Sequence, residues 1–436
     1  MTESGGATLE ERRAAPTPGA RRAAREARAG RGPEAGPAAD DVVERSAATP
    51  TDRPPRGRRS GDRIRRTAAR ERRRFWLATM PAVVVALVAL VGLGAMVRGR
   101  DTDAPARKPG TDLPTLARSA SIIGHTDADG AADLVLVVGR AGDRGSVLML
   151  PTSTQVEVPS LGIRTLAQVP AVGTDELLTT SVENLTGVRT GPPVLLDDAR
   201  LEALLAPAAP LRVDLPREVT FAGEPRPTYP SGTRRLDAAA AARVLTAAEP
   251  GSEVDRLVTV QAVLAAWFER LRDPAVATRT VAALDAARPL TVIARLGAPA
   301  FDTLPVDSIG TEADERLRVR SAALPVVIAR LFPDARLGIA GRRPRVEILN
   351  GVGRAGLAQA VSARVVPVGA DVRLTSNTRE FGVTETQVVY YRDADRAAAQ
   401  AILDAVGVGS LRRARRAVGI TDVTIVVGSD FAAQVP

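Results

Sequence analysis

Three glycines near the C-terminal end of the chain have the spacing of a phosphate-binding turn. Gly351, Gly353 and Gly356 form the pattern G-x-G-x-x-G. A strand-like stretch ending at Asn350 precedes them, and a helix-like stretch comes after them. In a dinucleotide-binding fold, such a turn brings backbone amides close to a pyrophosphate. In the alternative interpretation, the glycines permit a tight strand-to-helix turn and close packing.

The residues after this turn favour the structural interpretation. A dinucleotide site requires an acidic residue at the end of the second strand, about 20 residues further on. Asp371 has this spacing but begins the strand, whose far end carries Ser376 and Asn377. The remaining chain is also short for a complete dinucleotide fold. The alternative that stays open is an anion, such as a glycan carboxylate or phosphate, at the helix N-terminus.

The composition excludes several kinds of catalytic site. The chain of 436 residues has no cysteine and a single histidine, His125. Thiolate metal sites, cysteine nucleophiles and His-rich metal sites are therefore excluded. We expect His125 to lie on an exposed loop.

The N-terminal segment carries nearly all of the net charge of +9. Residues 1–74 hold 19 Arg and 11 acidic residues, with many Pro, Gly and Ala and few large apolar side chains. Such a composition predicts a disordered tail. No aromatic residue is interleaved with the Arg clusters for base stacking, so we expect no nucleic-acid partner.

Residues 75–97 predict a transmembrane helix. These residues carry no charge, and a helix of this length spans about 34 Å, enough for a hydrocarbon core of about 30 Å. The flank before the segment is far more basic than the flank after it. The positive-inside rule then places the N-terminus in the cytoplasm and residues 98–436 outside the plasma membrane. Residues 98–117 are rich in Pro, Gly and charge and predict a stalk.

The rest of the chain predicts two α/β domains that must position any functional residues. In residues 118–334, strands are expected around 134–138 and 146–150 and a long amphipathic helix over 253–273. We expect a mixed central sheet in this domain. Residues 345–431 predict a smaller α/β domain that contains the glycine turn.

Four short motifs can be compared with known families. Residues 149–154 read MLPTST, residues 236–248 read LDAAAAARVLTAA, and residues 253–263 read EVDRLVTVQAV. The fourth motif is the glycine turn with its flanking positions: Val346, Leu349, Asn350, Gly351, Gly353, Gly356, Leu357, Asn377, Val389, Tyr390 and Tyr391. With these motifs, residues 118–334 resemble the LytR-CpsA-Psr (LCP) family, and residues 345–431 resemble the LytR C-terminal domain.

The first resemblance implies a membrane-anchored enzyme. Members of the LCP family transfer glycopolymers from a polyprenyl-pyrophosphate carrier to peptidoglycan. Arginines clamp the pyrophosphate, and carboxylates hold Mg²⁺. The implied partners are therefore the membrane, peptidoglycan, polyprenyl-linked glycopolymer and other envelope proteins.

Most residues that this chemistry requires are replaced. Thr152 and Ser153 stand where the family has Arg and Asp. The other replacements are Thr126 for an Asp, Thr246 and Ala248 for two Arg, and Thr259 and Val260 for an Arg-Gln pair. The remnants are Asp133, Asp255, Arg256 and Gln261, of which Asp133 matches a metal carboxylate.

These replacements predict a non-catalytic member of the family. A threonine hydroxyl offers one neutral donor where a guanidinium offers a charged fork. Asp133 is then a turn residue, Arg256 pairs with Asp255 or Glu253, and Gln261 lies on the surface. We expect no cofactor, with Mg²⁺ at Asp133 only where transfer chemistry persists. The alternative is a divergent transferase that uses the four remnants. A transcription regulator is disfavoured, because no DNA-binding motif accompanies the basic tail.

Overall fold

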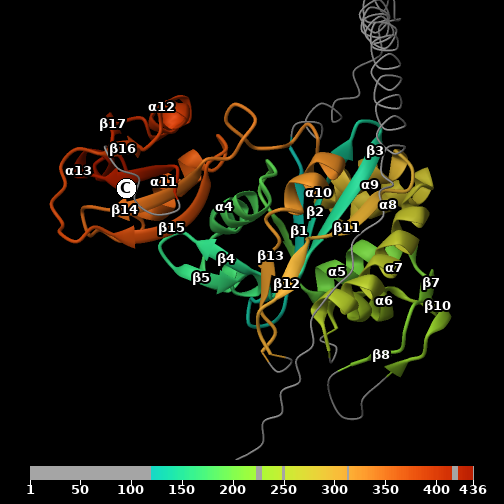
Figure 1. Ribbon diagram of the computed structural model, residues 1–436. Coiled ribbons are helices and arrows are strands. Elements are labelled where there is room, and N and C mark those ends of the chain that lie inside the picture. The colour runs from blue at the N-terminus through green and yellow to red at the C-terminus, as the bar shows by residue number, and fades with distance from the viewer. Residues whose placement is uncertain (1–118, 222–227, 248–250, 312–313, 415–420, 436) are drawn as a thin grey trace, which may run out of the picture. The chain divides into compact units, whose positions relative to one another are not determined.

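The computed structural model describes residues 119–221, 228–247, 251–311, 314–414 and 421–435 (Figure 1). The predicted tail of residues 1–74, membrane helix of residues 75–97 and stalk of residues 98–117 lie outside the described residues. Within the described ranges, no helix is both long and apolar enough to span a membrane. The chain divides into two units, residues 1–106 and 107–436, and every described residue belongs to the second.

The first domain, residues 119–335, is built on a mixed five-stranded sheet, as the sequence predicts. Its strands, in spatial order, are β11 (Ala300–Thr303), β3 (Arg144–Leu150), β2 (Ala132–Ala141), β1 (Ser121–Thr126) and β6 (Val194–Leu196). The three central strands pair antiparallel, whereas β6 and β11 run parallel to their neighbours. The strands predicted around 134–138 and 146–150 are β2 and β3.

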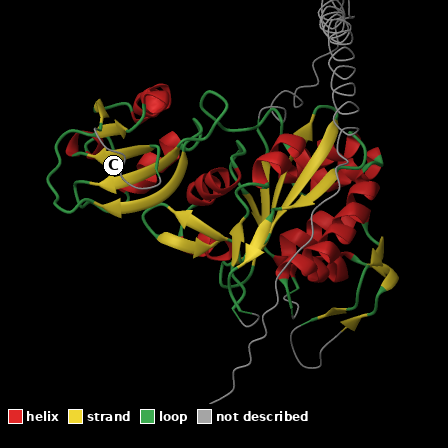
Figure 2. Cartoon of the chain, in the orientation of Figure 1, coloured by secondary structure: helices red, strands yellow, loops and turns green. Residues whose placement is uncertain are grey.

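Helices cover both faces of this sheet (Figure 2). Along β2, Leu134 and Leu136 belong to one buried cluster and Val135 and Val137 to another, which is the side-chain alternation of a strand. The first cluster is covered by α5 (Asp198–Leu205), α6 (Ala238–Thr246), α7 (Glu253–Leu271), α8 (Pro274–Ala283) and α9 (Arg288–Arg295). The second is covered by α3 (Val169–Val172), α4 (Asp175–Thr186) and α10 (Leu324–Leu331).

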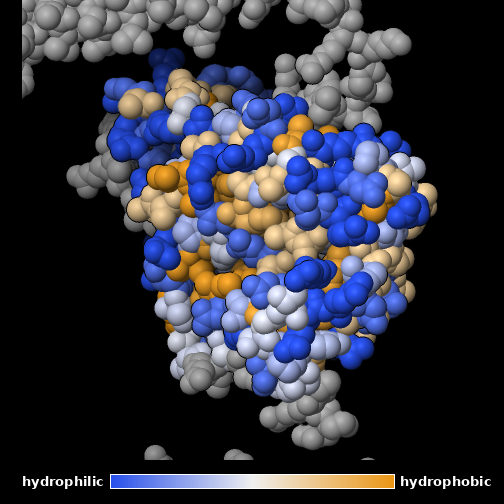
Figure 3. All heavy atoms as spheres, turned by 90° about the vertical axis from the view of Figure 1, so that its right-hand side faces the viewer, coloured by the Kyte–Doolittle hydropathy of each residue, from blue (hydrophilic) through white to orange (hydrophobic). Residues whose placement is uncertain are grey.

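Short hairpins and 3₁₀ turns complete the first domain. The hairpins are β4 (Gln155–Val158) with β5 (Gly162–Thr165), β7 (Leu211–Leu215) with β10 (Gly232–Leu236), β8 (Val219–Thr220) with β9 (Thr228–Tyr229), and β12 (Val306–Ser308) with β13 (Leu317–Val319). The 3₁₀ turns are η1 (Leu166–Gln168), η2 (Ala206–Ala208) and η3 (Asp285–Ala287). The side of the molecule with α7, α8 and β10 mixes hydrophilic residues with smaller hydrophobic patches (Figure 3).

The N-terminus of α7 is fixed by a side-chain cap. The hydroxyl of Ser252 accepts a hydrogen bond from the amide of Val254 at 3.2 Å. Serine is favoured at this position because it satisfies an amide that has no partner within the helix. The cap places Glu253 and Arg256 in the first turn of α7, on the side of the helix that meets the sheet.

The second domain, residues 343–435, has its own five-stranded sheet. The strand order is β15 (Asp371–Asn377), β14 (Arg345–Asn350), β18 (Val423–Val427), β16 (Gln387–Tyr390) and β17 (Ser410–Arg413), with β16 antiparallel to β18 and the other pairs parallel. Three α-helices and a 3₁₀ turn accompany it: α11 (Leu357–Val365), η4 (Asp393–Asp395), α12 (Arg396–Val406) and α13 (Ser429–Ala432). A third buried cluster fills this domain.

Polar contacts join the two domains. The Asn184 carboxamide, at the end of α4, donates to the carbonyl of Val372 and accepts from its amide, both at 2.8 Å. The carboxylate of Glu157 on β4 accepts from the amide and hydroxyl of Thr375 on β15. All three buried clusters are built from residues 120–432, and these residues belong to the one compact unit of residues 107–436.

Candidate functional site

Arg256 is buried, with 6% of its surface exposed. Its two terminal nitrogens donate to backbone carbonyls, that of Leu245 at 2.9 Å and that of Asp133 at 2.7 Å. One of them also lies 3.7 Å from the carboxylate of Glu253. Of the two acidic partners considered from the sequence, the structure therefore places Glu253, not Asp255, beside Arg256. The guanidinium is committed to holding the sheet, α6 and α7 together.

The carboxylate of Glu253 occupies a cradle formed by Thr152 and Ser153, just after β3. One oxygen accepts from the amide and hydroxyl of Thr152 at 2.5 and 2.8 Å. The other accepts from the amide and hydroxyl of Ser153 at 2.8 and 2.5 Å. Hydrogen bonds to an ionised acceptor are short and contribute about 1.5–3 kcal/mol each. The four donors are an anion-binding set, and the chain fills it with its own carboxylate.

Sequence reasoning missed Glu253 as part of this site. The contact joins positions about 100 residues apart, and a single sequence holds no signal for it. By resemblance, Thr152 and Ser153 are replacements for a family Arg and Asp. Their role in the cradle is visible only in the structure. There, amides and hydroxyls at the end of β3 form a set of donors that complements a carboxylate as well as a phosphate.

His125 lies on β1 and is 1% exposed, so the expectation of an exposed loop histidine is wrong. Its Nδ1 lies 2.8 Å from Asp133 Oδ1, and its Nε2 lies 3.1 Å from Asp198 Oδ1. The second contact is within ion-pair range but lacks hydrogen-bond alignment. Burial alone would lower the pKa of His125, but the two carboxylates outweigh it and raise the pKa above its ordinary value. They therefore favour the imidazolium form.

Asp133 is bonded to His125, so its carboxylate already has a side-chain partner. Burial raises the pKa of Asp133, although His125 and Arg256 act in the opposite direction. The nearby Asp127 uses one carboxylate oxygen to accept from the amides of Asp129 and Ala131. In the part of the chain that the structure describes, no group of three or more His, Asp or Glu is placed to hold a metal ion. A carboxylate that is bonded to a buried histidine and belongs to no such group does not fit a Mg²⁺ ligand set.

The other two predicted remnants lie apart from Asp133. Asp255 and Gln261 are both exposed on α7. The side chain of neither residue makes a hydrogen bond or ion pair with another described residue. Of the four predicted remnants, the structure thus brings together only Asp133 and Arg256, through the backbone carbonyl of Asp133.

A small apolar cavity lies beside His125, between the sheet and the helices that cover it. Its volume is about 20 Å³, and Leu134, Trp267 and Phe268 are among the residues around it. A cavity needs about 10–15 Å³ to hold one water. This space therefore accommodates about one water and no alkyl chain.

In the second domain, the glycine turn is closed by Asn350. The Asn350 carboxamide accepts from the amides of Val352 and Gly353 at 3.1 and 3.0 Å and donates to the carbonyl of Arg354 at 2.8 Å. Gly353 and Gly356 have φ values of 82° and 81°, which favour glycine. A Cβ on Gly351 would come within 2.7 Å of other atoms. These contacts favour the structural interpretation of the turn.

The described fold is similar to several solved structures. One is TagV of B. subtilis, at 13% identity and a TM-score of 0.41, covering 50% of this chain and 98% of TagV. Another is the LytR-Csp2A-Psr enzyme from Actinomyces oris, at 17% identity and a TM-score of 0.40, covering 53% of this chain and 97% of that enzyme. TagT of B. subtilis is similar at 15% identity and a TM-score of 0.40, covering 53% of this chain and 95% of TagT. At these values the likeness carries no argument about activity. No curated protein matches the chain.

The second domain has a match at the level of sequence. The match begins in the linker, includes the Asn350 turn and α11, and ends in α13. Residues 343–431 fit the family described as LytR cell envelope-related transcriptional attenuator, which identifies them as a LytR C-terminal domain.

Proposed function

We propose that this chain is a membrane-anchored protein of the cell envelope whose LCP-like domain is non-catalytic. It acts as a binding, scaffolding or regulatory partner in the attachment of cell-wall glycopolymers. In this proposal the N-terminus is cytoplasmic and residues 98–436 lie outside the plasma membrane. The observation that carries it is the carboxylate of Glu253, which fills the cradle of Thr152 and Ser153.

Transfer from a polyprenyl pyrophosphate needs cations around the leaving group. At the family's clamp positions the chain has neutral residues such as Thr152 and Thr246. The remaining Arg256 donates to two backbone carbonyls. Each lost contact of this kind removes about 2–4 kcal/mol of transition-state stabilisation. A pyrophosphate at the cradle would also meet the negative charge of Glu253.

The apolar cavity beside His125 supports the same conclusion. A polyprenyl carrier has a long apolar chain that must be shielded from water. The cavity of about 20 Å³ offers no space for it. In this proposal the partners are peptidoglycan, polyprenyl-linked glycopolymer held elsewhere, or other envelope proteins, and no cofactor is required.

The cradle is tested with inorganic pyrophosphate and residues 107–436. Calorimetry compares the wild type with Glu253→Ala, which vacates the cradle, and with Glu269→Ala, a matched change of an exposed glutamate on the same helix. We expect pyrophosphate to bind Glu253→Ala at least tenfold more tightly than the other two proteins. Equal binding by all three would show that Glu253 does not block the cradle and would remove the main support of the proposal.

The divergent-transferase alternative assigns catalysis to Asp133, Asp255, Arg256 and Gln261. The geometry does not favour it, because Arg256 donates to two backbone carbonyls and the exposed Asp255 and Gln261 lie apart from it. It predicts turnover that is lost in Arg256→Ala. The non-catalytic proposal predicts no turnover in either protein.

A further inference from the structure

A cavity of about 730 Å³ lies where the two domains meet, within the unit of residues 107–436. Its walls come from β4, the end of α4, α10, the linker around residues 336–343, and β15. This volume is within the range of about 300–1,000 Å³ that is typical of small-molecule sites. No lining residue belongs to the Glu253 cradle or to the glycine turn.

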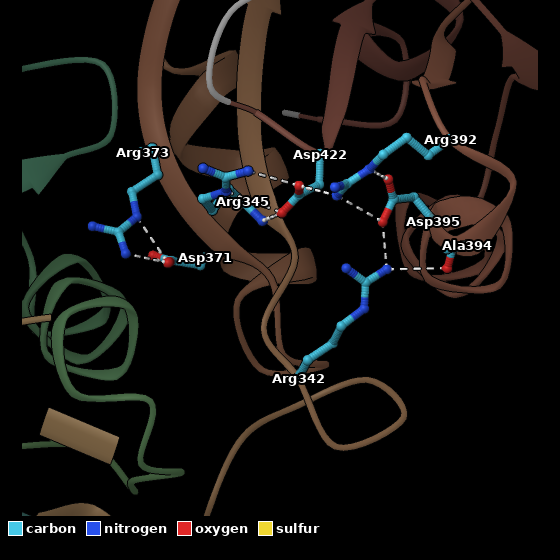
Figure 4. A network of polar contacts seen from close by, with 8 residues as sticks. All are labelled: Arg342, Arg345, Asp371, Arg373, Arg392, Ala394, Asp395 and Asp422. Carbon is cyan, nitrogen blue, oxygen red and sulfur yellow. Dashed lines mark hydrogen bonds and ion pairs between the residues drawn. The ribbon is translucent and has the colours of Figure 1, made fainter. Parts of the chain in front are cut away.

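Five arginines and two carboxylates line the cavity. Two of the arginines already have partners: Arg342 pairs with Asp395, and Arg373 pairs with Asp371 (Figure 4). The second lining carboxylate, Glu157, accepts hydrogen bonds from the second domain, and burial raises its pKa. The carboxylates therefore leave the other three arginines without an ion-pair partner.

Arg343 is the innermost of these three. One terminal nitrogen donates to the carbonyls of Asn184 and Ala370 at 2.9 and 3.0 Å. Its Nε is buried and bonds to no described residue. Burial lowers the pKa of Arg343 from its ordinary value. The carboxylates of Asp371 and Glu183 act in the opposite direction, although neither forms a direct ion pair with Arg343. A largely shielded guanidinium without a direct ion pair is unfavourable, so an anion in the cavity would stabilise it.

Arg318 and Arg336 add two exposed guanidinium groups to the same cavity. Among the described residues, the side chain of Arg336 bonds only to the carbonyl of Pro333, at 3.2 Å, and the side chain of Arg318 has no hydrogen-bond or ion-pair partner. The remaining wall is largely apolar and comprises Val156, Ile163, Leu185, Leu324, Ile328 and Leu337. The hydroxyl of Ser181, a residue 1% exposed, also lines the cavity without a partner in the described structure.

We propose that this cavity binds a phosphorylated amphiphile, a phosphate ester carried on an apolar chain. Arg318, Arg336 and Arg343 hold the phosphate, because guanidinium groups match its oxygens in paired hydrogen bonds. The apolar wall around Leu324 and Ile328 takes the chain. The binding does not depend on the proposed function, since the cavity and the cradle share no residue.

Calorimetry with residues 107–436 tests the ligand class. The probes are dodecyl phosphate below its micelle concentration, inorganic phosphate and dodecyltrimethylammonium. We expect dodecyl phosphate to bind at least tenfold more tightly than either of the others. Equal binding of inorganic phosphate would mean that the site takes a bare anion, and equal binding of the cation would mean that it takes any alkyl chain. Either result, or no binding of dodecyl phosphate, overturns the proposal.

Matched variants locate the binding. The double variant Arg318→Gln, Arg336→Gln should bind dodecyl phosphate at least tenfold more weakly than the wild type. Arg212→Gln with Arg235→Gln removes the same charge from the exposed β7–β10 hairpin and should change binding less than twofold. Leu324→Gln should weaken the binding of dodecyl phosphate but not that of inorganic phosphate. Val326→Gln changes a side chain that is 70% exposed and lies outside the cavity, and it should alter the binding of neither ligand. If the arginine variants in the cavity and in the hairpin had equal effects, and Leu324→Gln and Val326→Gln did too, the ligand would bind elsewhere.

Discussion

Ser153 donates two hydrogen bonds, from its amide and its hydroxyl, to one oxygen of the Glu253 carboxylate. The other oxygen accepts the same pair of donors from Thr152. The contact ties the end of β3 to the first turn of α7. It also turns a site suited to an external anion into an internal contact, and the proposed non-catalytic function depends on it.

The cradle predicts a measurable contribution to stability. Replacing Glu253 by Gln removes the charge and turns an acceptor into a donor that faces other donors. We expect the free energy of unfolding to fall by about 1–3 kcal/mol. Chemical denaturation of residues 107–436 checks this, with Glu269→Gln as the control at an exposed ion pair, where a change within about 0.5 kcal/mol is expected. Equal effects of the two changes would mean that the cradle contributes nothing special.

His125 predicts a dependence of stability on pH. Its pKa is raised in the folded state, so the folded protein binds the proton more tightly than the unfolded one. The stabilisation is complete below the unfolded pKa of about 6.5 and is lost as pH rises through the folded pKa. The unfolding free energy should therefore fall above about pH 6.5, and His125→Gln should flatten this slope.

The same residue offers a direct measurement. Because His125 is the only histidine in the chain, its imidazole gives a single NMR titration. We expect a pKa above the ordinary value. A midpoint at or below that value would mean that burial outweighs Asp133 and Asp198.

Much of the fold was predictable from the sequence, whereas most of the site was not. The apolar alternation of β2 and β3 and the stripe along α7 are local patterns, and the mixed sheet is consistent with them. The burial of His125 was missed because it depends on two carboxylates, one of which, Asp198, is 73 positions away along the chain. The partner of Glu253 was missed for the same reason. Exposed Asp255 and Gln261 were singled out by family resemblance, which carries no information about local geometry.

The glycine turn predicts unequal effects of two alanine substitutions. A Cβ at Gly351 would meet Val383 and the carbonyl of Val427 at 2.6–2.7 Å, so Gly351→Ala should destabilise the second domain by about 1–3 kcal/mol or more. Gly356 has open space around it but a φ of 81°, so Gly356→Ala should lower the free energy of unfolding by about 1–2 kcal/mol. Denaturation curves check the order. A larger loss at Gly356 would contradict the packing assigned to the turn.

Asn184 predicts how firmly the domains are joined. Asn184→Ala leaves the amide and carbonyl of Val372 without their partners at a buried position. We expect a loss of about 2–4 kcal/mol and faster proteolysis of the linker around residues 336–343. Thr179→Ala, at a half-buried position of the same helix where the hydroxyl donates to the Asp175 carbonyl within α4, is the control. Unchanged proteolysis would mean that other contacts hold the domains together.

The most direct test of the non-catalytic proposal is a turnover measurement. Residues 107–436 are incubated with a polyprenyl-pyrophosphate-linked glycan and peptidoglycan acceptor, with and without Mg²⁺, and release of the polyprenyl phosphate is measured. The proposal predicts no release above the protein-free control in either condition. Release that requires the protein and disappears in Arg256→Ala would contradict it and show that the domain is a working transferase.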